Sequence, residues 1–126
     1  MVLSIALKRE YIPKFNGNDK LPVSDQMKIV HRAPTNAMKE KLFPREFKYG
    51  ADGKVFGSIV VDRFKVLDEF TIDIINCTYQ VEGEKEPRKI KTVRDLFDGP
   101  TEFDALIEEL YNYYQELLNT KINEKN

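Results

Sequence analysis

The side chains that most often perform chemistry in proteins are scarce in this chain, which has one histidine and one cysteine, His31 and Cys77. A single cysteine excludes a disulfide within the chain, and one cysteine with one histidine supplies too few ligands for a zinc site. No G-x-S-x-G motif supplies a nucleophile for a histidine to activate. We therefore interpret His31 as a residue on one face of a strand and Cys77 as a small buried apolar residue.

Three acidic residues could hold a hard cation if the segment that contains them is helical. Asp62, Glu69 and Asp73 are spaced by seven and four positions, so they would share one side of a helix. The same spacing is typical of the solvent-facing side of an amphipathic helix, which needs no metal. The glycines follow neither the phosphate-binding nor the dinucleotide-binding pattern. The sequence thus predicts no metal, no cofactor and no enzymatic activity.

Length and composition predict one domain covering residues 1–126. The chain has 126 residues, of which 41% are hydrophobic and 33% charged, and this balance excludes a wholly disordered or fibrous protein. No apolar run approaches the ~20 residues that cross a bilayer. Residues 1–7 are apolar but lack the basic flank and the cleavage site of a signal peptide. We therefore expect a soluble, unexported protein that makes no contact with a membrane.

Charge is divided unevenly between the two halves of the chain. Residues 1–66 contain thirteen lysines and arginines against seven acidic residues, whereas residues 67–126 contain seven against fourteen. Such halves could neutralise each other within one fold, align neighbouring molecules, or attract nucleic acid to the basic half. The basic residues are scattered and not interleaved with aromatic residues, so nucleic-acid binding is the less favoured interpretation.

Residues 1–35 are interpreted as a strand, a loop and a return strand. Alternating apolar residues predict a strand over residues 3–11 with one buried face. The pair Asn16-Gly17 tolerates left-handed backbone angles and predicts that the chain reverses there. The return strand is expected over residues 27–33. The alternation of the first strand rests on Leu3, Ile5 and Leu7, and one face of the return strand would carry Met27, Ile29, His31 and Ala33.

Residues 36–75 are predicted to be helical. A short helix over residues 36–43 would follow the N-capping residue Thr35 and stop at a proline. Within residues 54–75, apolar and acidic residues fall on opposite sides of a helical wheel, which favours one amphipathic helix. The same segment is rich in β-branched residues and follows a glycine-containing turn, so residues 54–61 could instead form a strand of a hairpin.

A small hairpin and two further helices complete the predicted fold. Residues 76–92 form the hairpin around a polar turn. Residues 93–119 are helical in two pieces, a short helix that ends at Gly99-Pro100 and a longer amphipathic helix. Residues 120–126 form a polar tail that we expect to fray. The expected fold class is α+β, with N-terminal antiparallel strands, a central amphipathic helix, a small β-hairpin and a C-terminal amphipathic helix.

The C-terminal helix is the strongest candidate for a binding surface. Its apolar arc spans about 160°, wider than the ~100° that one core contact requires, and it carries three tyrosines, a residue type enriched at interfaces. Packing against the central helix would account for much of this arc. Arg63 lies within an apolar face, where it either pairs with an acidic residue of the second half or marks the edge of a contact. The candidate partner-binding residues are Arg63, Phe103, Leu110, Tyr111, Tyr113, Tyr114 and Leu117.

The order of segments resembles that of small tail-assembly-chaperone-like proteins of tailed phages, prophages and gene-transfer-agent elements. The resemblance covers most of the chain, but it consists of layout and loose motifs. It rests on EYIP (10–13), FNGN (15–18), LP (21–22), DQ (25–26), RAPT (32–35), IDIINCT (72–78), IKT (90–92), DL (95–96) and the final helix 104–118.

The resemblance implies a non-enzymatic role in which the chain binds a tail component, such as the tape-measure or tube protein. It also implies a bacterial host cell as the location, with the assembled particle as a second one. The predicted strands and hairpin depart from the mainly helical tail chaperones, which leaves open whether the protein is a transient chaperone or a retained structural subunit. Stacking of a basic half on an acidic half would give a homo-oligomer. The alternative function is a nucleic-acid-binding regulatory protein of a mobile element.

Overall fold

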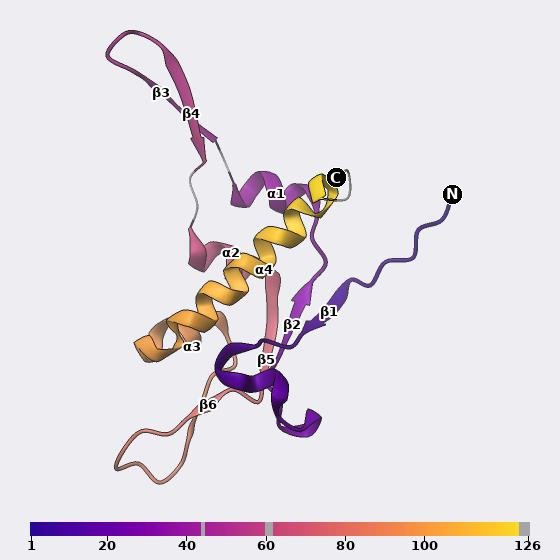
Figure 1. The fold of residues 1–126 in the computed structure, drawn as a ribbon, viewed down its shortest axis with the longest axis vertical. Coiled ribbons are helices and arrows are strands. Elements are labelled where there is room, and N and C mark those ends of the chain that lie inside the picture. Colours follow the sequence, from indigo (N-terminus) through magenta and orange to yellow (C-terminus); the bar gives the residue numbers. More distant parts are fainter. Residues whose placement is uncertain (44, 60–61, 124–126) are drawn as a thin grey trace.

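The computed structural model describes residues 1–43, 45–59 and 62–123, and it has the α+β architecture predicted from the sequence. A three-stranded antiparallel sheet has the order β1 (Lys8–Tyr11), β2 (Lys28–Arg32) and β5 (Thr71–Ile75). The long helix α4 (Asp104–Asn123) crosses in front of this sheet, as Figure 1 shows. No helix among the described residues is long and apolar enough to cross a membrane.

The return strand β2 supplies one wall of the core, as its alternation predicts. Met27, Ile29, His31 and Ala33 are all buried, so the predicted face is confirmed. Strand β1 pairs with β2 in antiparallel register, and Tyr11 lies opposite Ile29. Successive residues of a strand point to opposite faces, so the odd-numbered residues of β1 face the core.

The first strand is shorter than predicted. It begins at Lys8 rather than at residue 3, and the last hydrogen bond of the ladder joins the Ala33 amide to the Leu7 carbonyl at 2.9 Å. Pro34 follows Ala33 and has no amide hydrogen to donate, so β2 cannot continue alongside residues 1–6. The prediction that Leu3, Ile5 and Leu7 share a buried face is therefore wrong.

The loop between the first two strands is ordered by a turn and one buried side chain. Asn16 and Gly17 both have positive φ, of 52° and 75°, which confirms the predicted left-handed turn. The Asn18 amide nitrogen donates to the carbonyls of Pro13 and Met27 at 2.9 and 3.0 Å, and its oxygen accepts from the Met27 amide at 2.6 Å. These bonds satisfy backbone groups that the loop would otherwise bury without partners.

The predicted helix over residues 54–75 is wrong over most of its length. Strand β4 (Val55–Ile59) pairs with β3 (Arg45–Tyr49) in a hairpin that extends away from the body in Figure 1. Residues 60–61 lie outside the described residues. In the described part of the segment only α2 (Arg63–Phe70) is helical, capped by the Asp62 carboxylate on the Lys65 amide, and the chain continues directly into β5. The β-branched residues on either side of α2 favour strands, and pairing with β2 and β3 stabilises them there.

The remaining elements largely follow the predictions. Helix α1 (Asn36–Leu42) is capped by Thr35, and the hairpin of β6 (Thr78–Tyr79) and β7 (Arg88–Lys89) forms as expected. Helix α3 (Val93–Asp98) begins with a capping box and ends at Gly99. A 3-10 turn, Thr101–Phe103, then leads into α4, which continues through residues 120–123 instead of ending at 119. Residues 124–126 of the predicted tail lie outside the described residues.

Candidate functional site

Helix α4 turns most of its predicted binding arc toward the core. Leu110 and Tyr114 are fully buried, and Phe103 is 9% exposed. The Tyr114 ring stacks on Phe70 of α2 with centroids 4.5 Å apart, and its hydroxyl is 2.8 Å from the Thr71 hydroxyl. Phe103 packs against Phe15 and Tyr79. All three residues therefore belong to the core of the single chain, and their contact with a partner stays a prediction.

Tyr113 belongs to an aromatic cluster with Tyr11 and His31. The Tyr11 and Tyr113 rings are stacked with centroids 3.9 Å apart, and the Tyr113 hydroxyl lies 2.9 Å from Nε2 of His31. The Tyr11 hydroxyl donates to Glu109 at 2.6 Å, and burial together with this carboxylate raises the Tyr11 pKa. Glu109 also accepts from the Lys14 amide at 2.8 Å. The cluster therefore fastens β1 and the following loop to α4.

His31 is a satisfied core residue, as its place on the strand predicts. It is fully buried, and Nδ1 lies 2.9 Å from the Arg32 carbonyl oxygen. A carbonyl only accepts, so Nδ1 carries the proton and Nε2 accepts from the Tyr113 hydroxyl. Burial lowers the His31 pKa, with the Arg9 charge adding to the effect, while the hydrogen bond to the Arg32 carbonyl opposes it. The neutral ring thus serves packing and leaves no nitrogen free for proton transfer.

His31 makes the stability of the fold pH-dependent in a defined direction. Below the ordinary histidine pKa of about 6.5 the unfolded chain takes up a proton more readily than the folded one. We expect the free energy of unfolding to fall as the pH drops from 6.5 toward 5, with a slope of at most about 1.4 kcal/mol per pH unit. Urea unfolding at several pH values measures this slope.

His31 is the only histidine in the chain, which makes the control simple. The variant His31→Gln has no titratable side chain at position 31. The fall of its unfolding free energy with pH that is due to His31 should therefore be absent, whatever its absolute stability. A wild-type stability that is constant between pH 7 and 5, or an equal slope in the variant, would contradict this assignment.

Tyr111, Tyr113 and Leu117 are the predicted binding residues of α4 that keep partly exposed side chains. All three pack against the core cluster and are half-buried. Burial raises the pKa of both tyrosines, so their hydroxyls stay protonated at neutral pH. The exposed part of the arc is therefore much narrower than the sequence suggests.

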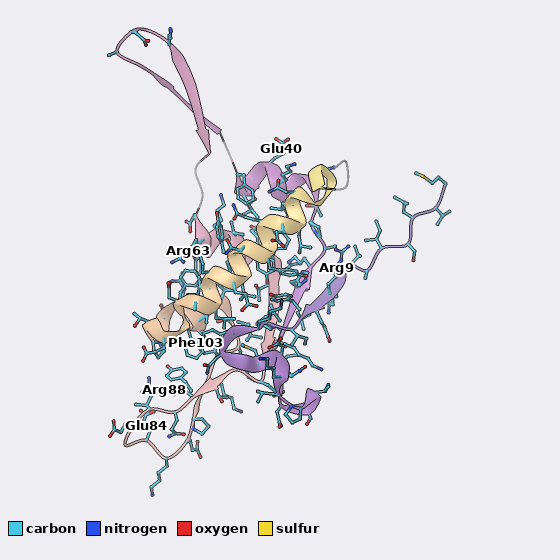
Figure 2. The ribbon with its side chains drawn as sticks, in the orientation of Figure 1. Arg9, Glu40, Arg63, Glu84, Arg88 and Phe103 are labelled. Carbon is cyan, nitrogen blue, oxygen red and sulfur yellow. The ribbon has the colours of Figure 1, made fainter. Side chains whose placement is uncertain are left out.

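Arg63 pairs with acidic residues of the second half of the chain. Its guanidinium lies 2.9 Å from the Glu108 carboxylate and 3.3 Å from that of Asp104, and Figure 2 shows it beside α4. A second bridge between the halves joins Lys41 to Glu69. These side chains are partly exposed, so each pair contributes at most about 1 kcal/mol. Two cations of the basic half are thus paired with acidic residues of the other half within one fold.

The described residues do not assemble a recognisable catalytic or metal-binding group. They contain no cluster of three or more histidine, cysteine or acidic side chains that could hold a metal ion. Asp62 caps α2, Glu69 pairs with Lys41, and Asp73 lies in β5, so the three predicted carboxylates do not share one helix face. Burial raises the pKa of Cys77 to about 11, which keeps the thiol protonated and unreactive.

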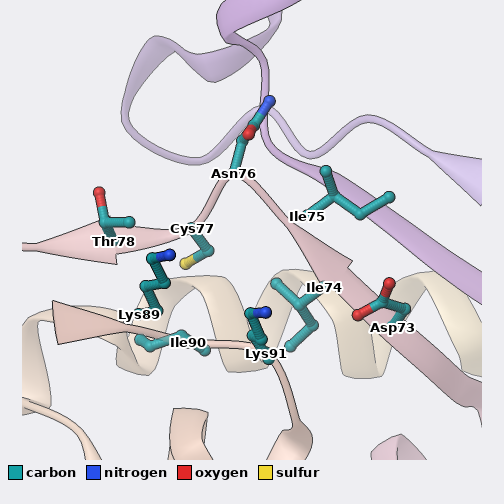
Figure 3. A pocket seen from close by; sticks show the side chains of 9 residues that line it. All are labelled: Asp73, Ile74, Ile75, Asn76, Cys77, Thr78, Lys89, Ile90 and Lys91. Carbon is teal, nitrogen blue, oxygen red and sulfur yellow. The ribbon is translucent and has the colours of Figure 1, made fainter.

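A shallow hollow of about 280 Å³ lies between β5 and residues 89–91. Figure 3 shows Ile74 and Ile90 lining it together with Cys77, with Lys89 and Lys91 along one side. Asp73, Asn76 and Thr78 also line it, and among the described residues no hydrogen bond joins the buried, protonated Cys77 thiol to a base. The hollow therefore offers packing surface rather than a reaction centre.

Among the residues whose burial the structure describes, exposed large apolar side chains are concentrated in the N-terminal arm, by which we mean residues 1–7, with Val23 of the following loop equally exposed. Leu3, Ile5 and Leu7 are 70%, 60% and 77% exposed. Figure 1 shows the arm leaving β1 and running away from the helices. Sequence reasoning detected the alternation but placed it in the core. The signal that points to exposure is Pro34, because it ends the strand that would have paired with the arm.

No family model, curated protein or solved structure matches this chain. The chain combines buried His31 and Cys77 with two ion pairs between its halves and an exposed apolar arm.

Proposed function

We propose that the protein works by protein–protein contact in the assembly of a phage-like tail, without catalysis. The observation that carries the proposal is the exposure of Leu3, Ile5 and Leu7 on an uncharged segment that leaves the body of the fold. Exposed apolar side chains in a row cost free energy in water and are typical of surfaces that become covered by another protein. The tail context comes from the sequence resemblance, which names a tape-measure or tube protein as the partner.

The β3–β4 hairpin supports the same role. It projects from the body, and a hairpin of two strands is only marginally stable by itself in water. A partner that packs on it would stabilise it. Within a bacterial host the protein would act in the cytoplasm, either released after assembly as a chaperone or retained in the particle as a small subunit.

Nucleic-acid binding receives less support, because Arg63 and Lys41 of the basic half are engaged by carboxylates of the acidic half. Binding through phosphate contacts requires cations that are free to release counterions, and its affinity falls steeply with salt.

Co-expression tests the proposal. A tagged chain produced together with the tube or tape-measure protein of its own gene cluster should co-elute with that protein and increase its soluble yield. The variant Ile5→Asp should lose co-elution, whereas Glu82→Ala, in the exposed β6–β7 loop, should keep it. Elution of the chain with nucleic acid instead, released by moderate salt, would favour the regulatory alternative and overturn the proposal.

A further inference from the structure

The N-terminal arm continues the residue pattern of the edge strand, although the chain bends at Leu7 just before β1 begins. Strand β1 lies at one end of the order β1-β2-β5, and among the described residues no strand pairs with its outer side. Arg9 and Tyr11 face the core, opposite His31 and Ile29. Leu3, Ile5 and Leu7 are also odd-numbered, so an arm that extended β1 straight would carry its apolar side chains on the same face.

We propose that two copies of this chain associate by antiparallel pairing of residues 3–11 about a two-fold axis at Leu7. In this register Leu7 lies opposite Leu7 of the second copy, and Leu3 lies opposite its Tyr11. The two sheets would then form one continuous sheet across the pair. This inference deepens the proposed function, on which it rests for the role of the arm as a contact element, and it names a second copy as the partner.

The charges on β1 limit which registers two copies can adopt. A two-fold axis at Lys8 or at Arg9 would place that residue opposite its own copy, and like charges directly opposite each other are destabilising. An axis at Leu7 instead places Lys8, Arg9 and Glu10 opposite Ala6, Ile5 and Ser4 of the second copy. No two like charges then face each other. Leu3, Ile5 and Leu7 all lie opposite residues of the second copy.

The arm and the edge strand have complementary features. An edge strand offers unpaired backbone groups, and an extended segment can satisfy them by adding a strand. The arm has no charged side chain before Lys8, and its three large apolar residues would come to lie on the α4 side of the sheet, the face where Tyr11 stacks on Tyr113. In a symmetric pair, the backbone groups of both arms and of both edge strands gain hydrogen-bond partners. A two-fold interface closes in this way, because each copy uses the same surface.

Light scattering of the purified full chain tests whether the pair forms. We expect a mass near twice the 14.7 kDa of the single chain. Ile5→Asp should raise the dissociation constant of the pair at least tenfold, and the matched variant Ile5→Val should leave it within about twofold. Near-UV circular dichroism of the buried tyrosines should be similar for all three proteins, which shows that the core is intact, because the Ile5 side chain is exposed in the single chain. A monomeric wild type, or a pair unaffected by Ile5→Asp, would overturn the proposal.

Cross-linking tests the register. Cys77 is buried, so an added cysteine in the arm would be the accessible thiol. Mild oxidation should convert Leu7→Cys to a disulfide-linked pair. Ser4→Cys should not cross-link, because the two Ser4 residues lie on the order of 20 Å apart in this register, at about 3.4 Å per residue. Equal cross-linking of both variants would contradict the assigned axis.

The outcomes separate this inference from the proposed function. A monomeric wild type that still co-elutes with a tail protein, and loses it on Ile5→Asp, would overturn self-association and leave the function standing. A wild-type pair that dissociates on Ile5→Asp but never co-elutes with a tail protein would support self-association and overturn the function.

Discussion

Replacing Tyr114 with alanine should lower the free energy of unfolding by about 3–5 kcal/mol, the range found for large aromatic residues removed from a core. Tyr114 is fully buried, stacked on Phe70 with an interplanar angle of 7°, and flanked by the His31 and Tyr113 rings. The cavity would lie where α2, α4 and the sheet meet, so collapse around it would require all three to move. Urea unfolding at a fixed protein concentration measures the loss.

The variant Tyr114→Phe separates the ring from the hydroxyl. It keeps the stacking and removes only the hydrogen bond to Thr71, so we expect a loss of about 1 kcal/mol. If both variants were equally destabilised, the hydroxyl and not the ring would be the main contribution. An alanine variant within 1 kcal/mol of the wild type would show that Tyr114 is not the centre of the core.

Replacing Asn18 with alanine should cost about 2–3 kcal/mol, because three hydrogen bonds worth roughly 1 kcal/mol each are lost. Asn18 is 6% exposed, and the groups it satisfies include both the amide and the carbonyl of Met27. Without these hydrogen bonds, no side chain at position 18 would hold the loop against Met27, next to the start of β2. Urea unfolding gives the size of the loss, and hydrogen exchange at the Met27 amide shows whether the loop has opened.

Two further variants define what Asn18 does. Asn18→Asp keeps an acceptor for the Met27 amide but cannot donate, and it places a carboxylate against two carbonyl oxygens, so it should be no more stable than the alanine variant at pH 7. Asp19→Ala, at the exposed neighbouring position, should change stability by less than about 0.5 kcal/mol. Comparable losses at Asn18 and Asp19 would show that the hydrogen bonds are not responsible.

Local chemistry in the sequence was sufficient to predict several elements. Thr92 with Asp95 forms a capping box, Thr35 caps α1 as predicted, and the left-handed turn falls at Asn16-Gly17. Each of these depends on contacts within a few residues along the chain, so the residue types and spacing contain the whole explanation. The buried face of β2 was equally predictable, because alternation determines which side chains share a side of a strand.

The segment 54–75 shows where local pattern is insufficient. Val66, Leu67, Phe70 and Ile74 face the core whether the chain is one helix or a helix followed by a strand. The apolar pattern therefore agrees with both structures. Only pairing with β2, whose paired residues lie 40 or more positions away along the chain, selects the strand for residues 71–75. The strand and helix propensities of the segment depend only on its own residues, so they carry no information about pairing with β2.

By itself the sequence determined the class of fold, the caps and turns, the scarcity of reactive groups and the presence of an apolar stripe on the last helix. Only the tertiary structure decided which apolar residues are covered. It buried Leu110 and Tyr114 between α2 and the sheet, and it left Leu3, Ile5 and Leu7 exposed because Pro34 ends their partner strand. Burial depends on what lies opposite a residue in space, and the sequence of one segment does not specify its neighbour.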